Sequence, residues 1–316
     1  MKHALLAICL SATPVLGSAQ TAGVAAAGYQ LPTIINVAPG QVLTFYIHGI
    51  GASLKSRVAA SSLPLPMSLA GISAVLVQSV PAVPMPILSV EPVSTCLDMG
   101  QPGCSPYTAV TVRIPSDIVA NDVATLRGAP VAATWVRFSE NGSVVATVDV
   151  VLYADQIHVL RACDTLFGGF PYIPCSTPLV VRADGSQVTS QAPAKPGDEI
   201  QIYAVGLGGT SGPDGDAVPS PRSVSILGIS FDARPNALPS RPSATTVLSQ
   251  PAFAGLIPGY VGLYQVNVTV PDHGPGTQPC NPYVRGPTRI DSNLTINIIG
   301  RNSFDGPAIC VQPSSQ

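Results

Sequence analysis

The chain carries little charge. Its 316 residues include 15 Lys and Arg and 17 Asp and Glu, so charged residues make up 10% of the sequence and the formal net charge is −2. Proteins that bind nucleic acid or an anionic membrane present a basic face, and this composition supplies none. Glutamate occurs only at Glu91, Glu140 and Glu199. A carboxylate pair for cleaving glycosidic bonds is therefore poorly supported.

Catalytic and metal-binding motifs are also missing. The sequence has neither a G-x-S-x-G serine elbow nor Cys or His pairs at zinc spacing, and His48, His158 and His273 lie in separate segments. Asp214 and Asp216 could contribute to a calcium site, but the rest of a calcium loop is absent and an Asp-Gly turn is favoured. We predict no catalytic residue, no cofactor and no metal.

A glycine-rich stretch follows a predicted strand at 206–212, as it does in dinucleotide-binding loops. Such a loop must open a helix whose N-terminus holds the phosphates. Here Pro213-Asp-Gly-Asp216 follows, which is typical of a turn. We expect a loop between strands.

The N-terminus has the features of a signal peptide. Lys2 and His3 precede an apolar run from Ala4 to about Leu16, and Gly17-Ser18-Ala19 offers small residues for cleavage before Gln20. The run is too short to span a bilayer, and no later segment is long and apolar enough to do so. Residues 1–19 are therefore predicted to direct export, which places the protein outside the cell or on its surface.

Six cysteines remain after the predicted cleavage, an even number typical of disulfides in an exported protein. Six cysteines allow many pairings. Their local spacing favours three short loops, joining Cys96 to Cys104, Cys163 to Cys175 and Cys280 to Cys310.

The sequence repeats itself. Pro39–Gly51 aligns without a gap on Pro196–Gly208, and Val110–Pro115 aligns on Val266–Pro271. Both blocks alternate apolar and polar residues, the period of a strand with one face on a core. We also pair a closing segment, Ala146–Val151, with Leu294–Ile299.

Abundant Val, Ile and Thr, with 29 Gly and 33 Pro, indicate many short strands. The repeat then predicts an all-β protein of two tandem immunoglobulin-like β-sandwich modules. The first module is expected at 30–157 and the second at 177–312, with a disulfide-containing linker at 158–176 between them.

The segment Ala254–Pro271, the strand ending in Gly206-Leu-Gly208 and Arg182–Ser186 together resemble the acidobacterial (Solibacter-type) uncharacterised C-terminal domain family. The resemblance is strongest over 176–299 and looser over 36–160, where a related immunoglobulin-like or IPT-like sandwich is expected. It implies export and a sandwich fold, and it assigns no activity. This chain departs from the family pattern in its cysteines and in an insertion around Pro235–Ser249.

Three aromatic residues are candidates for an interaction surface. Trp135 precedes a hairpin marked by Asn141-Gly142, and Tyr260 and Tyr264 lie among the glycines of the 254–271 segment. A packing role is favoured for each, and sugar stacking is the alternative.

These features favour a secreted or cell-surface, non-catalytic structural or interaction module, with adhesion as one role. Carbohydrate binding through the sandwich edge or loops is the alternative, and an extracellular hydrolase is less favoured. The ligand is not identified, and the partner classes considered are a glycan and a cell-surface protein.

Peptide mapping of the exported protein under non-reducing conditions tests export and pairing together. We expect an N-terminus at Gln20 and three linked peptides, containing Cys96 with Cys104, Cys163 with Cys175, and Cys280 with Cys310. Labelling of a free thiol, or a peptide linking two of these loops, would contradict the pairing.

Overall fold

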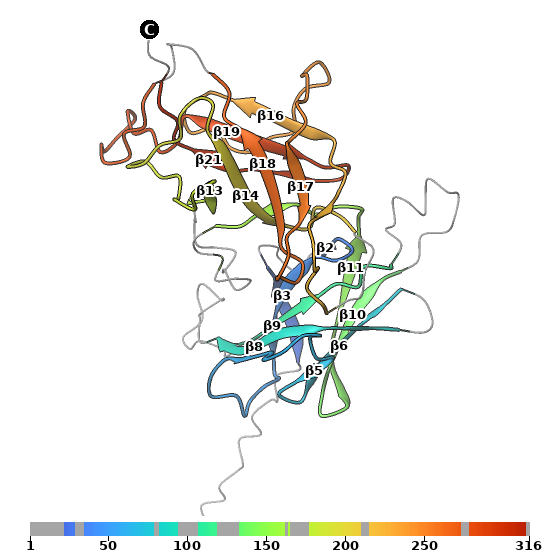
Figure 1. Ribbon diagram of the computed structural model, residues 1–316. Coiled ribbons are helices and arrows are strands. Elements are labelled where there is room, and N and C mark those ends of the chain that lie inside the picture. The colour runs from blue at the N-terminus through green and yellow to red at the C-terminus, as the bar shows by residue number, and fades with distance from the viewer. Residues whose placement is uncertain are drawn as a thin grey trace, which may run out of the picture.

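The protein is all-β. The computed structural model describes strands, turns and irregular segments, with no helix, in residues 22–28, 35–78, 82–93, 107–118, 133–161, 164, 177–209, 215–272 and 278–313. We call the described residues up to Tyr153 the N-terminal half and those from Ile157 onward the C-terminal half. Figure 1 shows the C-terminal half above the N-terminal half.

Two sheets form the N-terminal half. The first contains, in spatial order, β1 (Gly23–Ala27), β3 (Val42–His48), β9 (Tyr107–Arg113), β8 (Ile87–Val93) and β4 (Val58–Ala59). The second contains β2 (Ile35–Val37), β11 (Ser143–Leu152), β10 (Trp135–Glu140), β6 (Ile72–Val77) and β5 (Ser68–Leu69), with β7 (Val83–Met85) beside β6. Alternate residues of both sheets meet in one core, in which the rings of Phe45 and Phe138 pack edge to face at 5.2 Å.

The C-terminal half also has two sheets around its own core. The first contains β12 (His158–Val159), β14 (Glu199–Val205), β18 (Tyr264–Thr269), β17 (Phe253–Leu256) and β15 (Arg222–Ser223), with β13 (Val180–Arg182) also pairing with β14. The second contains β16 (Gly228–Asp232), β19 (Leu294–Ile299) and β20 (Phe304–Asp305), with β21 (Ala308–Ile309) also beside β19.

The two halves share one strand order. The repeated blocks form β3 and β9 in one half and β14 and β18 in the other, and each pair is antiparallel. Val42 lies opposite Arg113, and the aligned residues Glu199 and Thr269 lie opposite each other in the same way. The sequence repeat is therefore a repeat of pairing register, which fixes the side chains that face the core.

The third proposed correspondence, between Ala146–Val151 and Leu294–Ile299, is wrong by one strand. β19 lies between β16 and the β20–β21 arm, the place that β10 holds between β6 and β11. The end of β11 instead corresponds to Val311, because Val311 pairs in parallel with Ala194 as Leu152 does with Val37. Neighbouring strands of a hairpin share one alternating pattern, so the pattern alone did not separate them.

Gln156, in the connection between the halves, makes close backbone contacts with Gly206. The Gln156 amide donates to the carbonyl of Gly206 at 2.8 Å, and the Gly206 Cα faces the Gln156 carbonyl so closely that a Cβ there would lie 2.0 Å from the oxygen. Across the junction, the Gln41 side-chain amide donates to that carbonyl at 3.5 Å, and the Leu65 amide donates to Gly215 at 2.8 Å.

Replacing Gly206 by Ala tests this junction. Gly206 and Gly197 both have positive φ, 74° and 87°, but a Cβ on Gly197 meets nothing within 4 Å. Gly197→Ala should cost about 1–2 kcal/mol of backbone strain, and Gly206→Ala about 1–3 kcal/mol more through overpacking. The difference is measured from urea unfolding, and equal losses in the two variants would contradict the contact.

Candidate functional site

The C-terminal half differs from the N-terminal half in its edge strand. In the N-terminal half β1 pairs with β3 without interruption, apart from a bulge between Val24 and Ala26. In the C-terminal half the same edge is divided between β12 and β13, which both pair with β14. Arg161 and Pro178 face each other in an isolated bridge at the division. A long insertion therefore begins and ends where the other half has a bulge, a feature often found beside functional sites.

The segment between β16 and β17 is the second difference, and it contains the insertion recognised in the sequence. Its backbone is fixed to buried polar side chains of β19. The Thr295 hydroxyl donates to the Ala237 carbonyl at 2.6 Å, and the Ser240 amide donates to Asn297 Oδ1 at 2.9 Å. The insertion thus covers the outward face of β19, which explains why every residue of that strand is buried.

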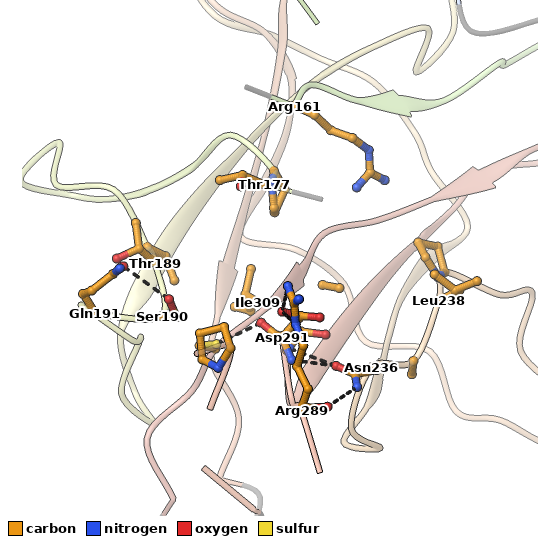
Figure 2. A pocket seen from close by; sticks show the side chains of 18 residues that line it. Arg161, Thr177, Thr189, Ser190, Gln191, Asn236, Leu238, Arg289, Asp291 and Ile309 are labelled. Atoms are coloured by element: carbon orange, nitrogen blue, oxygen red, sulfur yellow. Dashed lines mark hydrogen bonds and ion pairs between the residues drawn. The ribbon is translucent and has the colours of Figure 1, made fainter. Parts of the chain in front are cut away.

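One pocket of about 840 Å³, seen from close by in Figure 2, is lined by the described ends of the first insertion and by residues of the second. Arg161 and Thr177 come from the ends of the first insertion, and Asn236 and Leu238 come from the second. The segment between β13 and β14 contributes residues 188–191, and the segment before β19 and strand β21 contribute residues that include Arg289, Asp291 and Ile309. Loops held by two packed sheets are a common location for binding sites.

Charges in the pocket are paired within the protein. Arg289 Nε and Asp291 Oδ1 lie 2.8 Å apart. Arg161 Nη2 lies 3.4 Å from Asp305 Oδ1 and 3.5 Å from the Gly306 carbonyl. The Arg161 guanidinium points into the pocket in Figure 2, and its Nε and Nη1 have no partner among the described residues.

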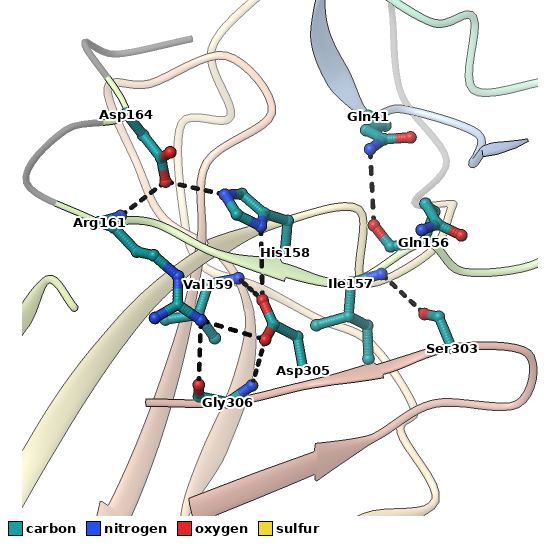
Figure 3. A network of polar contacts seen from close by, with 10 residues as sticks. All are labelled: Gln41, Gln156, Ile157, His158, Val159, Arg161, Asp164, Ser303, Asp305 and Gly306. Carbon is teal, nitrogen blue, oxygen red and sulfur yellow. Dashed lines mark hydrogen bonds and ion pairs between the residues drawn. The ribbon is translucent and has the colours of Figure 1, made fainter. Parts of the chain in front are cut away.

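A polar network behind Arg161 joins the start of the C-terminal half to its end, as Figure 3 shows. His158 Nε2 lies 2.8 Å from Asp164 Oδ2, and His158 Nδ1 lies 3.4 Å from Asp305 Oδ2. The same Asp305 oxygen accepts the Val159 amide at 2.7 Å. This network, His158 with Asp164, Asp305 and Arg161, ties β12 to β20.

The network favours charged forms. Burial alone lowers the pKa of His158, but hydrogen bonds to Asp164 and Asp305 outweigh it, and the net effect raises that pKa. Burial raises the pKa of Asp305, whereas His158 and Arg161 lower it, and the net effect lowers it. An imidazolium between two carboxylates is the form that satisfies both ring nitrogens as donors.

Another carboxylate, that of Asp155, fixes the connection between the halves. Asp155 is 5% exposed and accepts the backbone amides of Arg301 at 2.6 Å and Ser303 at 2.8 Å. The Ser303 hydroxyl also donates to Asp155, at 2.7 Å. The turn between β19 and β20 is therefore anchored to the chain that enters β12, which sets the position of the network.

The three aromatic candidates do not form one surface in the structure. Trp135 is half-buried at the start of β10 in the N-terminal half, and Tyr260 is 59% exposed in the β17–β18 loop. Tyr264 is fully buried, and its hydroxyl donates to the Gly208 carbonyl. Tyr264 therefore has the packing role that was favoured for it, and the alternative surface role is wrong, because its place on the core-facing side of β18 removes it from solvent.

Cys280 and Cys310 form a disulfide, as their spacing predicted, with Cα atoms 5.9 Å apart. It joins the segment before β19 to the end of β21, and Cys310 lines the pocket. The predicted pairs Cys96–Cys104 and Cys163–Cys175 and the predicted signal peptide lie outside the described residues. The predicted linker 158–176 begins with β12, a strand of the C-terminal half.

Sequence reasoning did not identify Arg161, Thr177 or Asp291. The available signal was the internal repeat itself, since described residues at both places where the second copy is longer than the first line the pocket. Among the described residues, no group of three or more His, Cys, Asp or Glu side chains is arranged to hold a metal ion.

In the same part of the chain no helix is long and apolar enough to cross a membrane. Comparison with protein-family models, with curated proteins and with solved structures finds no match to this chain.

The His158 network predicts a pH dependence of stability. A raised folded-state pKa contributes stability that is complete below the unfolded value of about 6.5. This stability is lost as the pH rises through the folded-state pKa. His158→Gln should flatten this decline in the free energy of unfolding as the pH rises above about 6.5. His48→Gln, at the end of β3, is the matched control and should retain it; a decline unchanged in His158→Gln would contradict the network.

Proposed function

We propose that this protein is an exported, non-catalytic binding protein of two tandem immunoglobulin-like modules, with its binding site in the second. The observation that carries the proposal is one pocket lined by residues at both ends of the first insertion and by residues of the second. Binding sites are commonly formed by loops that a rigid scaffold holds together at one place. A structural or adhesive role at the cell surface fits such a scaffold.

The shared strand order and the two separate cores support the module assignment. Two sheets with alternating inward residues around one core are typical of immunoglobulin-like sandwiches. The resemblance of the 254–271 segment to the Solibacter-type C-terminal domain family supports the same fold and export. The disulfide between Cys280 and Cys310 fits an oxidising compartment outside the cytoplasm.

The titratable groups beside the pocket favour binding over catalysis. A general base needs a lone pair directed at substrate, but both ring nitrogens of His158 face carboxylates. The Ser303 hydroxyl donates to Asp155, so it is not activated by a histidine in the manner of a catalytic serine. His158 and Ser303 therefore both form hydrogen bonds to carboxylates of the protein itself.

Turnover assays test the proposal. The purified mature chain, residues 20–316, is incubated with polysaccharide, ester and peptide substrates, and product formation is followed by mass spectrometry. We expect none above the buffer control. Turnover that disappears in Asp305→Asn, with His48→Gln as the control that retains it, would show an enzyme and overturn the proposal.

A further inference from the structure

The charge balance of the pocket argues against an ionic ligand. The cation of Arg289 is matched by Asp291 at 2.8 Å, and that of Arg161 by Asp305 at 3.4 Å. An ion entering the pocket would find no uncompensated charge among the described lining residues and would lose its own hydration. A neutral ligand therefore fits the described lining better than an ion does.

Donors and acceptors in the pocket nevertheless remain available. Arg161 Nε and Nη1, Asp291 Oδ2 and the Thr177 hydroxyl have no hydrogen-bond partner among the described residues. In Figure 2 Arg161 and Asp291 lie on opposite walls, with Thr177 beside Arg161. A hydroxyl both donates and accepts, so neighbouring hydroxyls of one ligand can satisfy a guanidinium on one side and a carboxylate on the other.

The rest of the described lining is mixed: it includes aliphatic groups and further polar side chains, namely Thr189, Ser190, Gln191, Asn236 and Ser292. Val188 and Ile309 belong to the buried core of the C-terminal half and form part of the lining, together with Pro178 and Pro239. These groups offer apolar contact without an aromatic ring. The volume of about 840 Å³ is within the range of pockets that hold ligands of several rings.

A peptide added as an extra strand fits the pocket poorly. The free side of β13 is occupied by the turn that pairs Val181 with Gln187. Beyond β21, the Ala194 amide donates to the Cys310 carbonyl at 2.9 Å. Strand addition needs an open row of backbone groups, and neither strand at the pocket supplies one.

We propose that this pocket binds a neutral oligosaccharide, whose hydroxyls are held by Arg161, Thr177 and Asp291 and whose C–H faces pack on the aliphatic lining. The inference rests on the proposed binding function and moves carbohydrate recognition away from Trp135, Tyr260 and Tyr264. A neutral oligosaccharide is thereby the proposed ligand class for the pocket beside the insertions of the second copy of the repeat.

Isothermal titration calorimetry with the mature chain tests this directly. The probes are cellohexaose, laminarihexaose, xylohexaose and mannohexaose, with hexagalacturonate as the acidic comparator. We expect at least one neutral hexaose to bind with a Kd below about 1 mM. Hexagalacturonate should bind more weakly than that hexaose.

Two conservative variants locate the site. Arg161→Lys can keep an ion pair with Asp305 but loses the planar donor edge, and Thr177→Val removes one hydroxyl from a side chain of the same shape. Each should weaken binding of the neutral hexaose by about tenfold or more, because a ligand hydroxyl loses its hydrogen-bond partner in the pocket. Arg57→Lys, at a half-exposed site in the N-terminal half, is the matched control and should bind as the unchanged protein does.

The outcomes separate the two proposals. Absence of binding by every neutral hexaose up to about 10 mM, binding unchanged in both pocket variants, or tighter binding of hexagalacturonate overturns the ligand class. In those cases the non-catalytic function stands if turnover is also absent. Cleavage of a bound hexaose overturns the non-catalytic function and leaves the ligand class intact.

Discussion

The antiparallel pairing of two central strands is the constraint on which each half of the protein depends. β3 with β9, and β14 with β18, keep the same register, so the same positions of the repeat face the core in both halves. A shift by one residue would turn the apolar side chains of a whole strand toward solvent. Every other strand is placed relative to this pair, and so are the insertions.

The pocket in the C-terminal half lies beside two insertions into this scaffold. One insertion divides the edge strand where the other half has a bulge, and the second covers the outer face of β19. The network of His158, Asp164, Asp305 and Arg161 then joins β12 to β20 behind the pocket. This ionic network lies at the wall of the pocket, and it holds Arg161 through Nη2, while Nε and Nη1 have no partner among the described residues.

Most of the fold was predictable from the sequence. Period-two alternation and the internal repeat predicted strands β3, β9, β14 and β18, and the Cys280–Cys310 pairing followed from local spacing. The third repeated block was misplaced by one strand because β19 has the same alternation as β10 and β11. The side chain of Tyr264 shares a strand face with Val266 and Val268, so the pattern itself already favoured burial.

The pocket was harder to predict from the sequence than the fold was. Arg161, Thr177 and Asp291 stand outside the repeated blocks, and their meeting depends on contacts between segments far apart in the chain. Single polar residues in irregular segments have no periodicity, and no alternation or spacing marks them. The insertion around Pro235–Ser249 was visible as a departure from the family pattern, but its packing over β19 depends on hydrogen bonds that only the folded chain reveals.

Hydrogen–deuterium exchange of the full mature chain, with and without a saturating neutral hexaose, tests the central claim that binding belongs to the insertions of the C-terminal half. The account predicts added protection at 158–161, 177–191, 236–239 and 289–292, with no change in β3, β9 or β10. Protection confined to the N-terminal half, or no change anywhere in the chain, would contradict it.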